Sequence, residues 1–318
     1  MSKLISLVAP FYNEERGAAA FFERVAGVIA SLPQYRFEVI AVNDGSRDNT
    51  LRELEAAHRR YDFVHVVDLS RNFGKEAALT AGLDRANGDA VVPIDSDLQH
   101  PPELIADMLE QWNKGAEVVL ARRNDRVTDG RMQKLSASFF YRVHNKISDI
   151  DIPPDVGDFR LMDRAVVQAL RQLPENRRFM KGLFAWVGFR TVTVPYDVEV
   201  RHSGTTSFNM WKLWNFALEG ITSFSTAPLR IWTYLGAGAS ALAMLYAVAI
   251  VVKTLLWGID VPGYASLMVA GLFLGGVQLV GIGVLGEYVG RIYSEVKRRP
   301  VYLVREEHPR RDQHDAAA

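Results

Sequence analysis

The sequence predicts an α/β fold: a cytoplasmic domain built on a mainly parallel sheet, followed by a C-terminal hairpin of two transmembrane helices. Two patterns support this prediction. Over the first ~120 residues, short apolar runs alternate with amphipathic stretches, which is the rhythm of βαβ units. From residue 232 to residue 286, the only charged residues are Lys253 and Asp260, as in a segment that lies in a membrane.

Five short apolar runs predict the strands of the sheet. They are Leu4–Ala9, Phe37–Asn43, Val64–Asp68, Ala90–Ile94 and Val118–Ala121. The segments between them have helical character, and they are Arg16–Ser31, Asn49–Tyr61, Lys75–Ala86 and Pro102–Lys114.

Polar clusters follow the first four predicted strands. They lie at residues 13–14, 43–46, 70–72 and 95–97. Because sheets of this kind bind ligands beyond the carboxyl ends of their strands, four polar strand ends in succession predict a binding cleft.

Asp95 and Asp97 are the central pair of this cleft. Alternate residues of an extended turn can aim two carboxylates at one point, and Mg²⁺ and Mn²⁺ prefer oxygen ligands of this kind. The alternative is a solvated turn that caps the next helix. Asp44 also has two interpretations. Its position suits a turn, and its carboxylate equally suits hydrogen bonds to a nucleobase.

Two long apolar runs predict the transmembrane helices. Ile231–Val252 and Val261–Gly286 each exceed the ~20 residues that a helix needs to cross a bilayer. We expect a turn in the link 253–266, which contains Gly258, Pro262 and Gly263. A buried helical hairpin in a soluble protein is the weaker alternative.

Basic residues around the two runs predict the orientation. Those before the first run are Lys212 and Arg230, and those after the second are Arg291, Lys297, Arg298, Arg299 and Arg305. The positive-inside rule then gives a multi-pass protein of the inner membrane with both termini in the cytoplasm. The N-terminal apolar run is too short for a signal peptide.

These patterns divide the chain into four parts: a domain over 1–205, an interfacial amphipathic segment over 206–229, two transmembrane helices over 230–290 and a cytoplasmic tail over 291–318. Asn209–Ile221 has the helical spacing of an interfacial helix. Leu135–Ile147 suits either the interface or the soluble domain. We expect Glu306–Ala318 to be disordered, with His308 in solvent.

Composition excludes several classes of function. The chain has 318 residues and no cysteine, which excludes a disulfide scaffold, a thiolate metal site and a cysteine nucleophile. Lys and Arg together number 37, as do Asp and Glu. This zero net charge argues against a nucleic-acid-binding protein.

Several motifs together resemble a known family. They read PFYNE at 10–14, VNDGS at 42–46, RNFGK at 71–75, IDSDLQHPPE at 94–103, GDFRLM at 157–162, GITSFSTAPLR at 220–230 and LGEYVGRIY at 285–293. The chain resembles the inverting family 2 glycosyltransferases with the GT-A fold. Within them it is similar to the polyprenyl-phosphate glycosyltransferases, the group of bactoprenol glucosyltransferase and dolichyl-phosphate mannose synthase.

The resemblance implies a metal-dependent transfer of a sugar from a nucleotide-sugar to polyprenyl (undecaprenyl) phosphate, with Mg²⁺ or Mn²⁺ as cofactor. It also implies the site. The residues implied to bind the nucleotide are Pro10, Tyr12, Glu14, Asp44 and Lys75. Asp95 faces the nucleotide-sugar, Asp158 lies near the sugar, and the metal is held by Asp97 and Gln99. The lipid phosphate or the diphosphate is held by Arg122, Arg131 and Arg201. Relatives often carry an acid and a lysine after the position of Arg201, and both are missing at 204–208.

The chemistry of the acceptor limits what the protein must supply. A phosphate monoester has its second pKa near ~6 and is mostly dianionic at neutral pH, so a strong general base is not required. We therefore expect Asp158 to bind or orient first and to act as a base second. The alternative is a structural carboxylate paired with Arg160.

Other functions remain open at this stage. UDP-glucose ranks first as the donor, with GDP-mannose or a UDP-aminopentose as alternatives. A processive polysaccharide synthase lacks support, because neither its Gln-x-x-Arg-Trp motif nor further spans occur. A non-catalytic membrane receptor for nucleotide-sugars is the rival from another class. The resemblance to the family, together with small residues on the apolar runs, favours a homo-oligomer.

Overall fold

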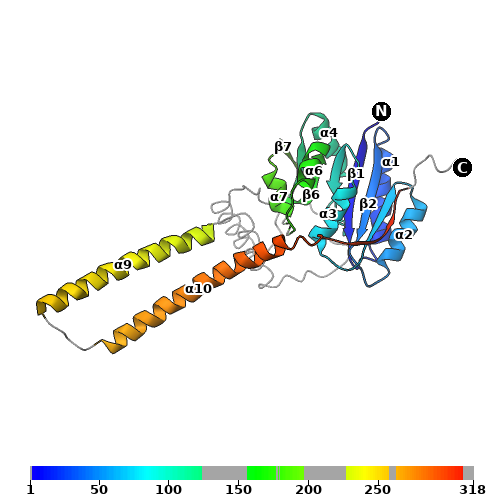
Figure 1. Cartoon of the computed structure of the whole chain (residues 1–318). Helices are drawn as coiled ribbons and strands as arrows, with labels where there is room; N and C mark the ends of the chain where they lie inside the picture. Colours follow the sequence, from blue (N-terminus) through cyan, green and yellow to red (C-terminus); the bar gives the residue numbers. More distant parts are fainter. Residues whose placement is uncertain are drawn as a thin grey trace.

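The computed structural model describes residues 2–123, 156–176, 178, 180–196, 227–257 and 263–310. Figure 1 shows a sheet with helices on both faces and two long helices that extend away from it. Arg131, Arg201 and the two predicted interfacial segments lie outside the described residues.

The sheet has eight strands in the order β7-β5-β6-β4-β1-β2-β3-β8. Their bounds are β1 Leu4–Phe11, β2 Arg36–Asn43, β3 Val64–Leu69, β4 Ala90–Pro93, β5 Val118–Arg123, β6 Val156–Asp163, β7 Thr191–Tyr196 and β8 Val304–His308. β4, β1, β2 and β3 are parallel neighbours, and β7 runs parallel to β5. The pairings of β6 with β4 and β5, and of β8 with β3, are antiparallel. The predicted α/β class is confirmed, with a mixed sheet.

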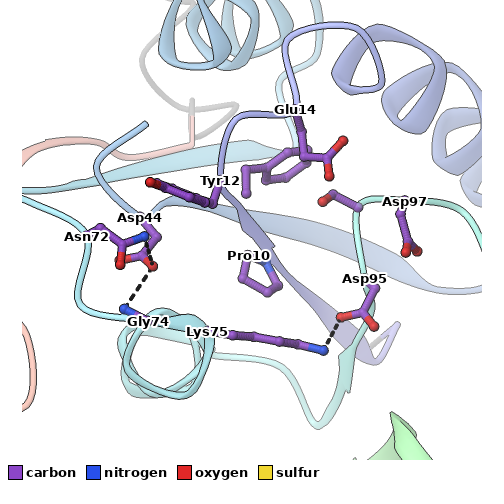
Figure 2. A pocket seen from close by; sticks show the side chains of 11 residues that line it. Pro10, Tyr12, Glu14, Asp44, Asn72, Gly74, Lys75, Asp95 and Asp97 are labelled. Carbon is purple, nitrogen blue, oxygen red and sulfur yellow. Dashed lines mark hydrogen bonds and ion pairs between the residues drawn. The ribbon is translucent and has the colours of Figure 1, made fainter. Parts of the chain in front are cut away.

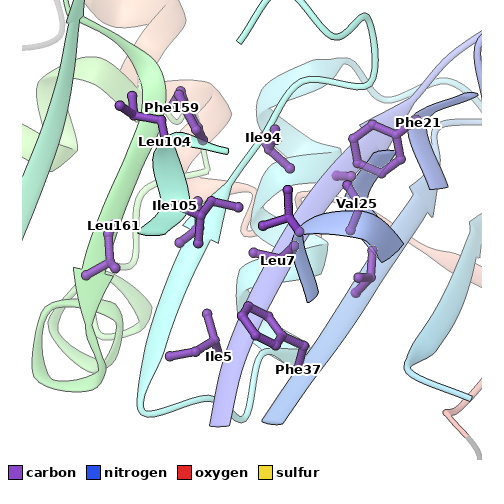
Figure 3. Close-up of a cluster of buried hydrophobic side chains, with 14 of the residues drawn as sticks. Ile5, Leu7, Phe21, Val25, Phe37, Ile94, Leu104, Ile105, Phe159 and Leu161 are labelled. Atoms are coloured by element: carbon purple, nitrogen blue, oxygen red, sulfur yellow. The ribbon is translucent and has the colours of Figure 1, made fainter. Parts of the chain in front are cut away.

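Helices cover both faces of the sheet, which explains why its central strands are apolar on both sides. α1 (Ala18–Ser31), α2 (Thr50–Arg60) and α4 (Leu104–Asn113) pack on one face; α3 (Lys75–Arg85), α6 (Arg164–Arg171) and α7 (Met180–Trp186) pack on the other. In β1, Ile5 and Leu7 point to the first core and Val8 to the second. Figure 3 shows Leu7 beside Ile94 in the first core.

The long helices are α9 (Ala227–Trp257) and α10 (Tyr264–Val296). Both are long and apolar enough to cross a membrane, and none of their described side chains is buried. The link between the helices is shorter than the predicted 253–266, because residues 253–257 continue α9 and residues 264–266 begin α10. Gly258 and Pro262, which predict the turn, lie outside the part of the chain that the structure describes.

The C-terminal tail corrects a prediction. Residues 306–308 belong to β8 and pair with β3, so this part of the tail is ordered. His308 is only partly exposed and its ring lies 5.9 Å from that of His58. The charged side chains of this segment give it no apolar strand pattern in the sequence. It can still form a strand, because an edge strand needs few apolar residues.

Candidate active site

A pocket of about 280 Å³ opens at the carboxyl ends of the parallel strands. It is lined by Pro10, Phe11, Tyr12, Glu14, Asp44, Asn72, Gly74, Lys75, Asp95, Ser96 and Asp97. Seven of the predicted site residues are in this set. Figure 2 shows Asp44 on one side of the pocket and the pair Asp95 and Asp97 on the other.

Asp44 organises the first side of the pocket. Its Oδ2 accepts hydrogen bonds from Asn72 Nδ2 at 3.0 Å and Gly74 N at 2.9 Å, and its Oδ1 accepts one from Phe73 N at 2.7 Å. Burial raises the pKa of Asp44, although the two backbone N–H groups and the charge of Arg71 oppose this. The carboxylate therefore holds the loop that precedes α3 and still has one lone-pair position for a ligand.

Two loops meet tightly beside Asp44. Gly45 has a φ of +61°, and a Cβ at that position would clash with the backbone of Arg71 and Asn72. Only glycine allows this close approach and this conformation. Asn13 and Leu98 also adopt a positive φ, at 54° and 57°. All three positions lie in loops next to the pocket. The backbone around the pocket therefore includes residues in a conformation that is uncommon elsewhere in proteins.

A lysine bridges the carboxylates on the second side. Lys75 Nζ lies 2.7 Å from Asp95 Oδ1 and 2.8 Å from Asp158 Oδ2. Burial lowers the pKa of Lys75, but the charges of Asp95 and Asp158 outweigh it and raise that pKa overall. Asp158 does not line the pocket itself, yet the lysine joins it to the pocket wall.

Asp158 has a different partner from the predicted alternative. Burial would raise the pKa of Asp158, but the charge of Lys75 lowers it below its usual value. Arg160 instead donates to the carbonyl of Gly157 at 2.8 Å and lies over the ring of Phe184. The ion pair that Asp158 makes among the described residues is therefore with Lys75, and the charge of Arg160 has a smaller effect on the pKa of Asp158 than that of Lys75.

Two further predicted residues, Gln99 and Arg122, lie outside the pocket wall. Gln99 donates its backbone N–H to Asp97 Oδ1 at 3.2 Å, but it is not in the pocket wall. Arg122 is exposed on β5 and does not line the pocket. Arg131 and Arg201 are outside the part of the chain that the structure describes.

Sequence reasoning missed two groups near the acidic side. His100 is partly buried, with Nδ1 3.8 Å from Asp95 Oδ2 and its ring against Phe159. Burial lowers the pKa of His100, although the charges of Asp95 and Asp97 oppose this. Glu76 follows Lys75 on α3, and burial together with the charge of Asp158 raises its pKa to about 7. His100 lies within the motif at 94–103 and Glu76 directly follows the motif at 71–75, but the orientation of their side chains is not readable from spacing.

The carboxylates of the pocket suit a divalent cation that is bound partly by the protein and partly by the phosphates of a substrate. Four carboxylates line the wall, on Glu14, Asp44, Asp95 and Asp97, against the ammonium of Lys75. Such a wall repels an anionic diphosphate unless a cation enters with it. Within the described ranges no group of three or more His, Cys, Asp or Glu residues could hold a metal alone. Mg²⁺ typically uses one or two carboxylates plus substrate phosphates, so the residues fit.

Comparison with known proteins shows the family to which the chain is similar. Residues 6–171 match the family described as "Glycosyl transferase family 2", and residues 227–292 match the "GtrB C-terminal hairpin". The chain is 54% identical to an uncharacterized glycosyltransferase of Synechocystis, over 94% of each chain. It is 52% identical to the SfII prophage-derived bactoprenol glucosyl transferase of Shigella flexneri, over 96% of this chain and 98% of that one. A prophage bactoprenol glucosyl transferase homolog of Escherichia coli is 50% identical, over 95% and 98%.

Proposed function

This chain is a glycosyltransferase that belongs to family 2, and we propose that it transfers glucose from UDP-glucose to polyprenyl phosphate. The likeness to bactoprenol glucosyl transferases spans both the domain and the hairpin. The observation that carries the proposal is the acidic pocket at the strand ends, where Asp95 and Asp97 line the side opposite Asp44. GDP-mannose and a UDP-aminopentose remain the alternative donors.

The nucleotide occupies the side of the pocket that holds Asp44 in this proposal. Tyr12 is 43% exposed, and its ring offers a face on which a base can stack. The remaining acceptor position of Asp44 suits an N–H group of that base. The N-terminus of α3, at Lys75, places the positive end of a helix dipole near the diphosphate.

Asp97 and Gln99 are the residues that would hold Mg²⁺ or Mn²⁺, and Asp95 would face the nucleotide-sugar beside them. When bound, the cation neutralises the donor diphosphate and stabilises the charge that develops on the leaving group. Lys75 adds a further positive charge at the same edge. With the cation bound, the positive charges of the cation and of Lys75 would let the acidic side of the pocket bind an anionic diphosphate.

The acceptor attacks without a strong base. A phosphate oxygen of the lipid forms a bond to the anomeric carbon while the bond to the UDP oxygen breaks, which inverts the configuration from α to β. Since the ion pair with Lys75 keeps Asp158 a weak base, we assign Asp158 to orienting Lys75 and the sugar. We assign Arg122, Arg131 and Arg201 to the acceptor phosphate or the diphosphate, because arginine binds phosphate with two parallel hydrogen bonds.

The hairpin places this reaction at the membrane. Its two apolar helices indicate membrane association, and we propose that they span the inner membrane with both termini in the cytoplasm. The chain has no cysteine, so single cysteines introduced by Gly263→Cys and Arg299→Cys report topology cleanly. A membrane-impermeant maleimide should label the first from outside the cell, and the second only after lysis. We also propose that the chain forms a homo-oligomer.

A donor screen tests the proposed function. The full chain in detergent is incubated with undecaprenyl phosphate, Mg²⁺ and each nucleotide-sugar separately, and the lipid fraction is analysed by mass spectrometry. We expect a lipid-linked hexose from UDP-glucose, with loss of the product in EDTA. Nucleotide binding without lipid product from any donor would support a non-catalytic receptor instead.

A further inference from the structure

The segment that follows the hairpin returns to the catalytic domain. We call residues 302–310 the C-terminal strap. Within it, β8 extends the sheet along the edge of β3, and Ser70 N donates to the carbonyl of Leu303 at 2.8 Å. Tyr302 donates to Asp84 at 2.8 Å. Figure 1 shows the strap crossing the domain after α10.

The strap supplies positive charge to two buried carboxylates. Asp68 is 1% exposed and Glu38 is 2% exposed. Arg305 Nη1 lies 3.5 Å from Asp68 Oδ2, and Arg310 Nη1 lies 3.8 Å from Glu38 Oε2. Among the described residues, Asp68 Oδ2 has no hydrogen-bond partner. A buried carboxylate without a nearby cation is costly, so each arginine ties the strap to the sheet.

Arg305 connects directly to the loops of the pocket. Its guanidinium donates to the carbonyl of Ser70 at 2.6 Å. Asp68 Oδ1 accepts from Asn43 Nδ2 at 2.7 Å, and Asn43 Oδ1 accepts from Ser46 N at 3.3 Å. Arg305 is therefore linked to the loop after β3 through Ser70, and to the loop after β2 through Asp68 and Asn43.

These two loops meet at Asp44. The loop after β3 provides Asn72, Phe73 and Gly74, which all donate to Asp44. The loop after β2 contains Gly45, which packs against the backbone of the other loop. A shift of either loop therefore changes the nucleotide side of the pocket.

We infer that Arg305 is a positioning residue for the donor. Through Ser70, Asp68 and Asn43 it holds the loop that carries Asp44, and the loop that donates hydrogen bonds to Asp44, in the shape that binds a nucleoside diphosphate. This inference rests on the proposed function for the identity of the ligand. It gives the chain beyond the hairpin a role in donor binding, although that chain does not touch the pocket.

The test uses full-length Arg305→Gln, with Arg310→Gln as the matched control. Arg310 also joins the strap to a buried carboxylate, but Glu38 lies toward the ends of the strands that face away from the pocket. Binding of UDP and of GDP is measured by calorimetry in Mg²⁺, together with KM for donor and acceptor. We expect about fivefold weaker nucleotide binding in Arg305→Gln, a matching rise in donor KM and an unchanged acceptor KM. Arg310→Gln should bind as the wild type does, and Arg305→Lys should recover part of the loss.

Hydrogen exchange separates this inference from the proposed function. Without nucleotide, the peptide that covers residues 70–75 should exchange faster in Arg305→Gln than in the wild type, because the loop loses the hydrogen bond to the Ser70 carbonyl and the amides of Phe73 and Gly74 are then held less firmly against Asp44. Unchanged exchange and unchanged affinity would overturn the inference, as would an equal loss of affinity in Arg310→Gln. A wild type that binds neither nucleotide would remove the proposed donor site, while faster exchange would still support the role of Arg305 in holding the loop.

Discussion

The two sides of the pocket are held in different ways. On one side, Asp44 accepts three hydrogen bonds from uncharged donors, two of them backbone N–H groups. On the other side, Asp95 and Asp158 share the ammonium of Lys75, and Asp97 stands beside them in the wall. Hydrogen bonds within the loops fix the first side, whereas a balance of charges sets the second.

This difference separates the roles of the two sides. The Asp44 side has its final shape before a ligand arrives, so binding there costs little rearrangement. On the acidic side, a cation or a phosphate changes the charges that face Lys75, and the ion pairs must adjust. We therefore expect changes of metal, charge and pH to act on the acidic side and to leave the Asp44 side nearly unaffected.

The largest effect should come from Asp97→Asn. The change keeps the shape of the side chain but removes a charged oxygen from the proposed metal site. We expect kcat/KM for lipid glycosylation to fall about a thousandfold. Steady-state assays with saturating Mg²⁺ measure this.

The control for this substitution is Asp107→Asn, which changes an exposed carboxylate on α4. It should leave the rate at the wild-type value. A rate for Asp97→Asn within tenfold of the wild type would mean that the metal has other ligands.

Lys75→Met should have the next largest effect. The substitution removes the cation that Asp95 and Asp158 share, and we expect kcat/KM to fall about a hundredfold, a smaller loss than for Asp97 because the lysine side chain is 47% exposed. Since the charge of Lys75 lowers the pKa of Asp158, the acidic limb of the pH–rate profile should shift to higher pH. A lower rate with an unshifted profile would contradict the assignment of Lys75 as the partner of Asp158.

The smallest effect concerns stability at the acidic side. Burial and the charge of Asp158 raise the pKa of Glu76 from 4.5 to about 7, so the folded protein holds this proton more tightly than the unfolded chain. The resulting stabilisation is complete below pH ~4.5 and is lost as the pH rises through ~7. Glu76→Gln should remove this pH dependence and, after allowance for partial exposure, stabilise the protein at pH 8 by about 1 to 2 kcal/mol.

Thermal unfolding at pH 5.5 and pH 8 measures that difference. The wild type should lose more Tm between the two values than Glu76→Gln does. Parallel changes of Tm in the two proteins would exclude Glu76 as a source of the pH dependence.

The sequence predicted the first five strands and the helices between them because each has a clear period of apolar residues. It did not predict β6, β7 or β8. The antiparallel strand β6 contains the motif around Asp158, and its polar residues interrupt the apolar pattern. β8 reads VREEH, and its place in the sheet depends on ion pairs with Asp68, Arg85 and His65 that no local pattern reveals.

The candidate site was predictable where short motifs lie at strand ends. Tyr12, Asp44, Asp95 and Asp97 all line the pocket, because parallel strands bring their carboxyl ends to one edge. The partners of these residues were not predictable. Which cation pairs with Asp158 depends on the packing of α3 against the sheet, and that information is not contained in the spacing of residues.

The most direct test of this comparison is nucleotide binding with and without metal. Calorimetry in Mg²⁺ and in EDTA is run on the wild type, Asp97→Asn and Asp44→Asn, with the nucleotide of the donor that the transfer assay identifies. We expect Mg²⁺ to tighten binding to the wild type and to Asp44→Asn, although the latter should bind more weakly in both conditions. Asp97→Asn should bind equally with and without the metal. A full gain from Mg²⁺ in Asp97→Asn would contradict the assignment of the cation to the acidic side of the pocket.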